Sequence, residues 1–114
     1  MTVSDIARIL KAEVLCEGDS MEAEVHTACG SDMMSDVLAY VKDQSVLLTG
    51  LVNSQVVRTA EMMDMVCIVF VRGKRPTEDM VELADENDMV LICTPFSMFK
   101  TCGLLWELGM KPLY

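Results

Sequence analysis

The chain has 114 residues, a typical length for one domain, and we expect a single domain over residues 1–114 with its own apolar core. Eighteen acidic residues against nine basic ones give a formal net charge of −9, which argues against general affinity for nucleic acid. No apolar stretch approaches the roughly 20 residues that a membrane helix needs. The first residues lack a signal-peptide pattern, so we expect a cytoplasmic protein that binds neither nucleic acid nor membranes.

The composition also bears on partners and on the state of the thiols. Apolar residues make up 52% of the chain, and eleven residues are methionines. Such a surplus favours a contact surface, most simply one for a second copy of the chain. The five cysteines are odd in number and include no CxxC pair. We expect them to be reduced and to pack as small apolar side chains.

The first elements in chain order are a helix and two short strands. Thr2 or Ser4 can cap a helix whose apolar face is formed by Val3, Ile6, Ala7 and Leu10. A strand is expected over residues 13–16, followed by an acidic turn over residues 17–24. Apolar and polar residues then alternate over residues 23–29, which is typical of a strand near the edge of a sheet.

From residue 45 onward one pattern occurs three times: an apolar run, a turn with small or polar residues, and a helix pattern. The runs span residues 45–50, 65–71 and 89–94. Runs that are apolar on both faces and alternate with helices are typical of a covered parallel sheet. The sequence therefore predicts a three-layer α/β domain with a mainly parallel sheet of four to five strands and helices on both faces.

The helices of this pattern have recognisable starts and stops. Asn53 or Ser54 can cap the helix after the first run, and Thr77 the helix after the second. The last helix is expected to begin near Pro95, to stop at Gly109 and to bury one apolar stripe: Met98, Phe99, Cys102, Leu105 and Trp106. A further helix is expected before the first run, with the apolar positions Met33, Met34, Val37, Leu38 and Val41.

The turns that follow the parallel strands carry the residues best suited to a ligand. Carboxyl ends of parallel strands meet at one edge of the sheet, where open α/β folds bind their ligands. Helix N-termini there attract anions, and glycine lets a ligand approach the backbone. One turn also holds three basic residues. The candidate ligand-binding residues are Gly30, Ser31, Thr49, Gly50, Asn53, Ser54, Arg58, Arg72, Lys74, Arg75 and Thr94.

The turns after the parallel strands also have a purely structural interpretation as tight turns and helix caps. Phosphate-loop, metal and acid–base sites find less support in the sequence. The phosphate-binding string GxxxxGK[ST] does not occur in the sequence. His26 and Cys29 are three apart on an expected strand and point to opposite faces, and no second histidine completes a zinc site. Glu78, Glu82 and Asp85 share a helical face that is typical of a solvated surface. We expect no catalytic residue, no metal and no cofactor.

Three stretches resemble a known family: LTGLVNSQVVRTAE at residues 48–61, VFVRGK at 69–74 and MFKTCGLL at 98–105. They resemble the DRTGG-domain family, whose members are similar to the N-terminal domain of HPr kinase/phosphorylase. The resemblance implies a regulatory or dimer-forming α/β module and not a catalyst. The family signature has an Asp-Arg pair after the turn glycine. This chain has LVNS after Gly50, with Asn53 and Arg58 as the nearest polar substitutes.

These observations predict a non-enzymatic regulatory or ligand-sensing module that forms a homodimer. It is expected to bind a small anionic ligand, such as a nucleotide or a phosphorylated metabolite, at the carboxyl ends of the strands. The alternative is a pure protein–protein interaction or dimerisation module without a small-molecule ligand. The pairs Met33/Met34 and Met62/Met63, each expected to have one outward member, and the apolar residues 110–114 favour such a contact surface.

Overall fold

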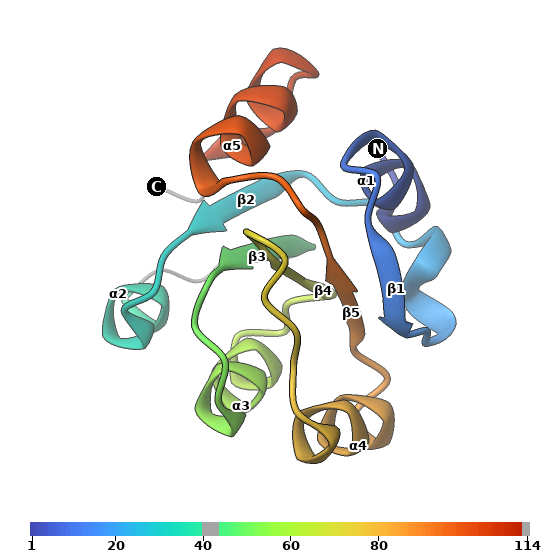
Figure 1. Ribbon diagram of the computed structural model, residues 1–114, viewed down its shortest axis with the longest axis vertical. Helices are drawn as coiled ribbons and strands as arrows, with labels where there is room; N and C mark the ends of the chain where they lie inside the picture. The colour runs from blue at the N-terminus through green and yellow to red at the C-terminus, as the bar shows by residue number, and fades with distance from the viewer. Residues whose placement is uncertain (40–43, 113–114) are drawn as a thin grey trace.

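The computed structural model describes residues 1–39 and 44–112 and forms a single sheet between two layers of helices (Figure 1). The α-helices are α1 (Val3–Ile9), α2 (Met34–Leu38), α3 (Ser54–Met62), α4 (Glu78–Glu86) and α5 (Met98–Glu107), and η1 (Asp19–Glu22) is a 3₁₀ helix. The strands are β1 (Glu13–Cys16), β2 (Thr27–Gly30), β3 (Ser45–Thr49), β4 (Cys67–Phe70), β5 (Val90–Cys93) and β6 (Lys111–Pro112). Val41, a predicted helix position, lies outside the described residues.

The sheet has six strands in the order β1-β5-β4-β3-β2-β6. Neighbours from β5 to β6 pair in parallel, and β1 pairs antiparallel with β5. The predicted mainly parallel α/β fold is thus confirmed. The six strands exceed the expected four to five, because residues 111–112 of the apolar tail pair with residues 27–28 of β2.

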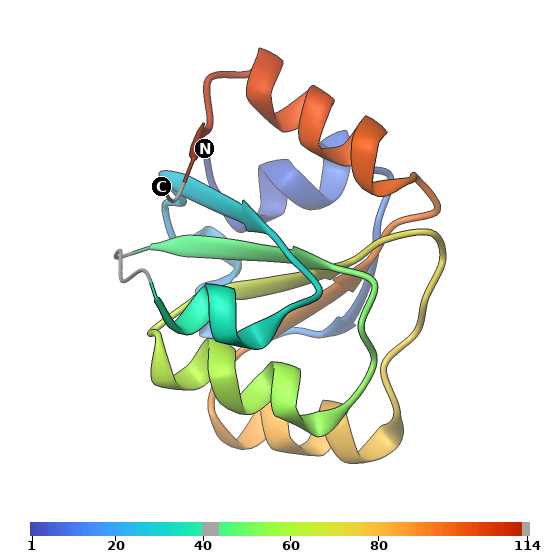
Figure 2. The ribbon, with the colours of Figure 1, turned by 90° about the vertical axis from the view of Figure 1, so that its left-hand side faces the viewer.

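The three apolar runs form strands whose every residue is buried. Successive side chains point to opposite faces, so Leu47 packs toward α2, α3 and α4, and Leu48 packs toward α1 and α5. Figure 2 shows these two helical layers above and below the sheet. Among the described residues, no helix is long and apolar enough to cross a membrane.

Three of the predicted helix starts are confirmed by side-chain caps. Thr2 caps α1 in a reciprocal capping box with Asp5, while Asn53 caps α3 and Thr77 caps α4. The methionine pairs also divide as predicted: Met33 and Met62 are exposed, whereas Met34 packs against the core and Met63 is buried. Gly109 follows α5 with φ +95°, the left-handed conformation of a helix stop.

The prediction for the last helix is wrong in its start and in its buried stripe. α5 begins at Met98, capped by Ser97, and not near Pro95. Phe99 and Trp106 are 90% and 68% exposed. The buried residues of α5 are Thr101 and Leu105, with Met98, Cys102 and Leu104 packed beside them. Thr101 is polar, so the apolar pattern does not mark it as a core position and favours a stripe that includes the outward aromatic residues.

Two earlier elements are also shorter than predicted. Of the strand expected over residues 23–29, only the part from Thr27 onward forms a regular strand, β2. Glu24 instead forms an isolated antiparallel bridge with Thr2. The helix expected from residue 33 is described for five residues, with Met33 at its N-cap position and no side-chain cap. Part of the acidic turn at residues 17–24 forms η1.

Candidate anion-binding edge of the sheet

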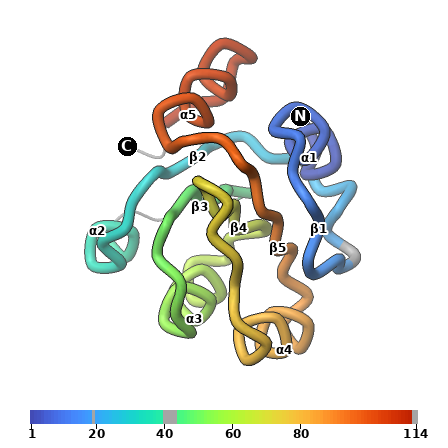
Figure 3. Tube along the Cα trace, viewed as in Figure 1, coloured from blue at the N-terminus to red at the C-terminus, as the bar shows by residue number. Residues whose placement is uncertain are grey.

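The parallel strands β2, β3, β4 and β5 place the turns that follow them at one edge of the sheet. Within this edge, β4 continues to α4 on one face, and its neighbour β5 continues to α5 on the other (Figure 3). Two neighbouring strands whose connections leave toward opposite faces create a topological switch point. In open α/β sheets the usual place for a ligand is at such a switch point, outside the carboxyl ends of the strands.

Asp32 joins the turns after β2 and β3. Its Oδ1 accepts a hydrogen bond from the backbone N–H of Gly50 at 2.8 Å and another from the Thr49 hydroxyl at 2.9 Å. Thr49 in turn accepts from the N–H of Leu51 at 3.1 Å. The hydrogen bonds from Gly50 and Thr49, together with the positive charge of Arg72, hold the pKa of Asp32 below its ordinary value of 3.8. This part of the edge therefore already stabilises one negative charge.

Arg72 lies at the switch point and adopts a left-handed backbone conformation, with φ +59°. Its N–H donates to the carbonyl of Phe96 at 2.8 Å, and the N–H of Gly73 donates to the carbonyl of Thr94 at 2.8 Å. These bonds fasten the turn after β4 to the turn after β5. The Arg72 guanidinium packs against Gly50 so closely that a Cβ on Gly50 would collide with it. A side chain at position 50 would therefore force the Arg72 guanidinium to shift.

Two further cations lie in the segments on either side of the switch point. Lys74 is exposed in the turn after β4. Lys100 is exposed in the first turn of α5, with its Nζ 4.0 Å from the centroid of the Phe96 ring. Phe96 is the residue whose carbonyl accepts from Arg72. Three exposed cations therefore lie in the segments that follow β4 and β5, in a chain of net charge −9.

Several predicted site residues use their polar groups within the fold. The buried Thr94 hydroxyl donates to the carbonyl of Leu10 at 2.7 Å and accepts from the N–H of Phe96 at 3.2 Å. Ser31 accepts from the N–H of Met33 at 3.0 Å in a turn that contains no capped helix start. The side chain of Asn53 caps α3.

Two of the predicted basic residues point elsewhere. Arg75 pairs with Glu13 of β1 at 2.5 Å. Arg58 lines a hollow between α3 and α4 together with Ser54 and with acidic residues of α4. Gly30 ends β2 and borders a separate hollow beside α5. The structure thus brings Thr49, Gly50, Arg72 and Thr94 together, with Lys74 in the same turn as Arg72.

The structure also describes the residues that the sequence analysis weighed for other chemistry. His26 is exposed and Cys29 is buried, so the two do not form a pair. All five cysteines are free, four of them buried, and burial raises the pKa of each thiol. Within residues 1–39 and 44–112, no group of three His, Cys, Asp or Glu side chains is placed to hold a metal ion.

Sequence reasoning missed three residues of this edge: Asp32, Phe96 and Lys100. The partners of Asp32 lie 17 and 18 residues away in the sequence, so no local pattern marks it as a site residue. The spacing of Phe96 and Lys100, four residues apart, is a signal that would have suggested their contact.

Comparisons with known proteins agree with this architecture. The model of the DRTGG domain matches residues 5–108. A similar solved structure is that of the CBS and DRTGG domains from the regulatory region of a Clostridium perfringens pyrophosphatase, complexed with its activator diadenosine tetraphosphate. It superposes with a TM-score of 0.73 at 15% identity, covering 91% of this chain and 45% of that chain.

The present chain therefore spans less than half of that pyrophosphatase region, and at this identity the likeness concerns the fold. No curated protein sequence matches. Similarity to the N-terminal domain of HPr kinase/phosphorylase stays a prediction. The family match covers nearly the whole chain and agrees with the resemblance of residues 48–61, 69–74 and 98–105. The chain belongs to the DRTGG-domain family.

Proposed function

We propose that this domain is a non-catalytic regulatory module that works as a homodimer and binds a small anionic ligand, such as a nucleotide or a phosphorylated metabolite. The ligand site is the switch point between β4 and β5. The observation that carries the proposal is the presence of exposed Arg72, Lys74 and Lys100 in the segments that follow β4 and β5 of an otherwise acidic chain. A ligand-bearing regulatory region with the same fold adds support, since the pyrophosphatase structure holds a nucleotide activator.

The ligand contacts follow from the geometry of the edge. Arg72 offers planar N–H donors that match two phosphate oxygens, whereas Lys74 and Lys100 add point charges. Thr49, Gly50 and Thr94 hold the turns in place beneath them. The neighbouring Asp32 carboxylate limits the net positive charge, so binding is expected to be reversible and sensitive to salt.

A thermal-shift and calorimetric titration with ATP, ADP and pyrophosphate tests this site. A ligand at about 100 times its Kd should stabilise the domain by roughly 2.7 kcal/mol. Arg72→Ala and Lys74→Ala should weaken binding at least tenfold. The matched control is Arg8→Ala, which removes one positive charge from an exposed pair with Asp5 on α1 and should leave binding intact. Absence of any shift, or equal losses in Arg8→Ala, contradicts the proposed site.

Binding without turnover is the second part of the proposal. ATP incubated with the domain and Mg²⁺ should release no more phosphate than ATP alone. Phosphate release that disappears in Lys74→Ala would overturn the non-catalytic assignment. The outward aromatic residues Phe99 and Trp106 favour one alternative, a pure dimerisation module. A stable dimer with no thermal shift from any of the three anions would support it.

A further inference from the structure

We propose that the outward face of α5 joins two copies of this chain, with Phe99 of each copy seated in a hollow beside Trp106 of the other. The inference rests on the homodimer proposed above and assigns its surface. It shares Lys100 with the proposed anion site at the carboxyl ends of β4 and β5, but it uses neither Arg72 nor Lys74.

The projecting part of this face is formed by residues of α5 that a globular core would normally bury. Phe99 is 90% exposed and Trp106 is 68% exposed. They are seven residues apart and lie on one face of the helix, with Gly103 between them. A Cβ on Gly103 would meet no atom within 4 Å, so another helix can approach closely there. Exposed aromatic residues on such a face are typical anchors of protein interfaces.

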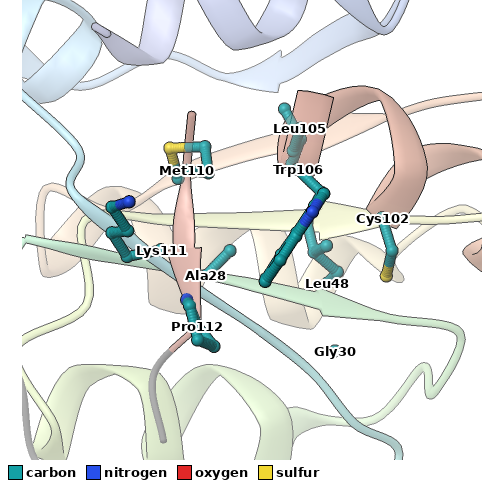
Figure 4. A pocket seen from close by; sticks show the side chains of 9 residues that line it. All are labelled: Ala28, Gly30, Leu48, Cys102, Leu105, Trp106, Met110, Lys111 and Pro112. Carbon is teal, nitrogen blue, oxygen red and sulfur yellow. The ribbon is translucent and has the colours of Figure 1, made fainter. Parts of the chain in front are cut away.

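The receiving part is a hollow of about 160 Å³ between α5, β2 and β6. Figure 4 shows the Trp106 indole standing over it, with Pro112 and Lys111 on one side and Cys102 on the other. Gly30 contributes only backbone to the wall. The apolar side chains that line the hollow are Ala28, Leu48, Cys102, Leu105, Met110 and Pro112. An apolar hollow next to an exposed indole suits an aromatic side chain.

The projecting part and the hollow lie side by side along α5, and this makes the surface self-complementary. In a two-fold dimer each contact occurs twice with the copies exchanged. Antiparallel α5 helices that cross between Cys102 and Gly103 place Phe99 of one copy against Trp106 of the other. The same crossing brings exposed Lys100 within about one helical turn of exposed Glu107 of the second copy, so opposite charges face each other.

The amount of surface is adequate, and charge disfavours α4 as the dimer face. An aromatic side chain buries roughly 150–250 Å². Phe99 and Trp106 therefore supply a large part of the roughly 800 Å² that each partner buries in a standard interface. The outward face of α4, by contrast, is strongly acidic, and two copies would repel each other there. Its exposed carboxylates are Glu78, Asp79, Glu82, Asp85 and Glu86.

Sedimentation of the full chain and two variants provides the first test. The wild type should be a dimer at micromolar concentration, and Phe99→Glu should raise the dimer Kd by at least about 100-fold, because two anchors are lost at once. Met62→Glu is the matched control. Met62 is 68% exposed, as Trp106 is, but lies on α3. It should leave the Kd unchanged, and circular dichroism should show that both variants fold.

Fluorescence reads the same contact directly, since Trp106 is the only tryptophan of the chain. Dilution of the wild type below its Kd should shift the emission to the red, whereas Phe99→Glu should emit at the red position at every concentration. Gly103→Cys should form a disulfide-linked dimer on mild oxidation, and Glu82→Cys on α4 should not.

A dimer that persists unchanged in Phe99→Glu, or whose tryptophan emission does not depend on concentration, overturns the α5 surface but leaves the homodimer standing. A wild-type chain that is monomeric at millimolar concentration overturns both. Neither result affects anion binding at Arg72, which is measured separately.

Discussion

The carboxylate of Asp32 accepts a hydrogen bond from the backbone N–H of Gly50 at 2.8 Å and so connects two turns that follow neighbouring strands. The same oxygen accepts from Thr49, and Arg72 adds a favourable charge. A carboxylate of the chain itself thus occupies the Gly50 N–H, which would otherwise be free to bind a ligand. The stability of this edge is therefore expected to depend on that carboxylate.

Asp32→Ala should destabilise the domain by about 1 kcal/mol at pH 7, because Gly50 and Thr49 lose their acceptor. The folded pKa of Asp32 is lowered, so its contribution is present above the ordinary value of 3.8 and is lost as the pH falls through the folded pKa. Urea unfolding should show the difference from wild type shrinking between pH 4 and pH 2. Ala in place of the exposed Glu61 should change stability by less than about 0.5 kcal/mol at pH 7. A difference for Asp32→Ala that stays constant with pH argues against an ionised acceptor.

Gly50→Ala should weaken ATP binding roughly tenfold, because the added Cβ displaces the Arg72 guanidinium. In an Arg72→Ala background the same change should have little further effect. Calorimetry on the four proteins of this double-mutant cycle gives the coupling between the two residues. Additive losses would mean that Gly50 acts on the ligand independently of Arg72.

Two buried threonines should respond in opposite ways to replacement by valine. Thr94→Val removes a hydroxyl with two hydrogen bonds and should cost roughly 2–3 kcal/mol. The Thr101 hydroxyl is buried and finds no hydrogen-bond partner among the described residues. Thr101→Val should therefore be neutral or stabilising. Chemical denaturation of both variants checks this, and a large loss in Thr101→Val would reveal an additional partner for its hydroxyl.

Gly103→Ala should have two separable effects. In the monomeric Phe99→Glu background it should raise stability by roughly 0.5–1 kcal/mol, because Gly103 is a helix position with free space around it. In the wild-type background it should weaken the dimer, since the α5 helices could no longer approach as closely. Gly18→Ala is the contrasting control. A Cβ there would lie 2.9 Å from the carbonyl oxygen of Asp88, so this change should destabilise the fold.

The fold was predictable because its strongest signals are local. The fully buried strands β3, β4 and β5 are continuous apolar runs, and Thr2, Asn53 and Thr77 cap helices within three residues of their own positions. The errors arose where the fold depends on distant pairing. β6 exists because the tail returns to β2, and this contact leaves no trace in the local sequence.

The candidate edge was predictable in position but not in detail. Arg72 and Gly50 were recognisable as turn residues after apolar strands. Their close approach was not, because it depends on how the turns after β3 and β4 pack. Asp32 carries no pattern of its own and acquires its importance only from Gly50 and Thr49. On α5, the order of aromatic and small residues fits two different stripes, and packing decides between them.

The connection between Arg72 and Phe96 has a mechanical consequence. Phe96 directly precedes the N-cap of α5, and its carbonyl accepts from the N–H of Arg72. α5 is a rigid rod of about 15 Å. In a dimer built on α5, an anion that displaces Arg72 would also displace the N-terminus of α5, and α5 contacts both subunits. Anion binding to one subunit would then change the dimer interface of the second subunit without unfolding any part of the sheet.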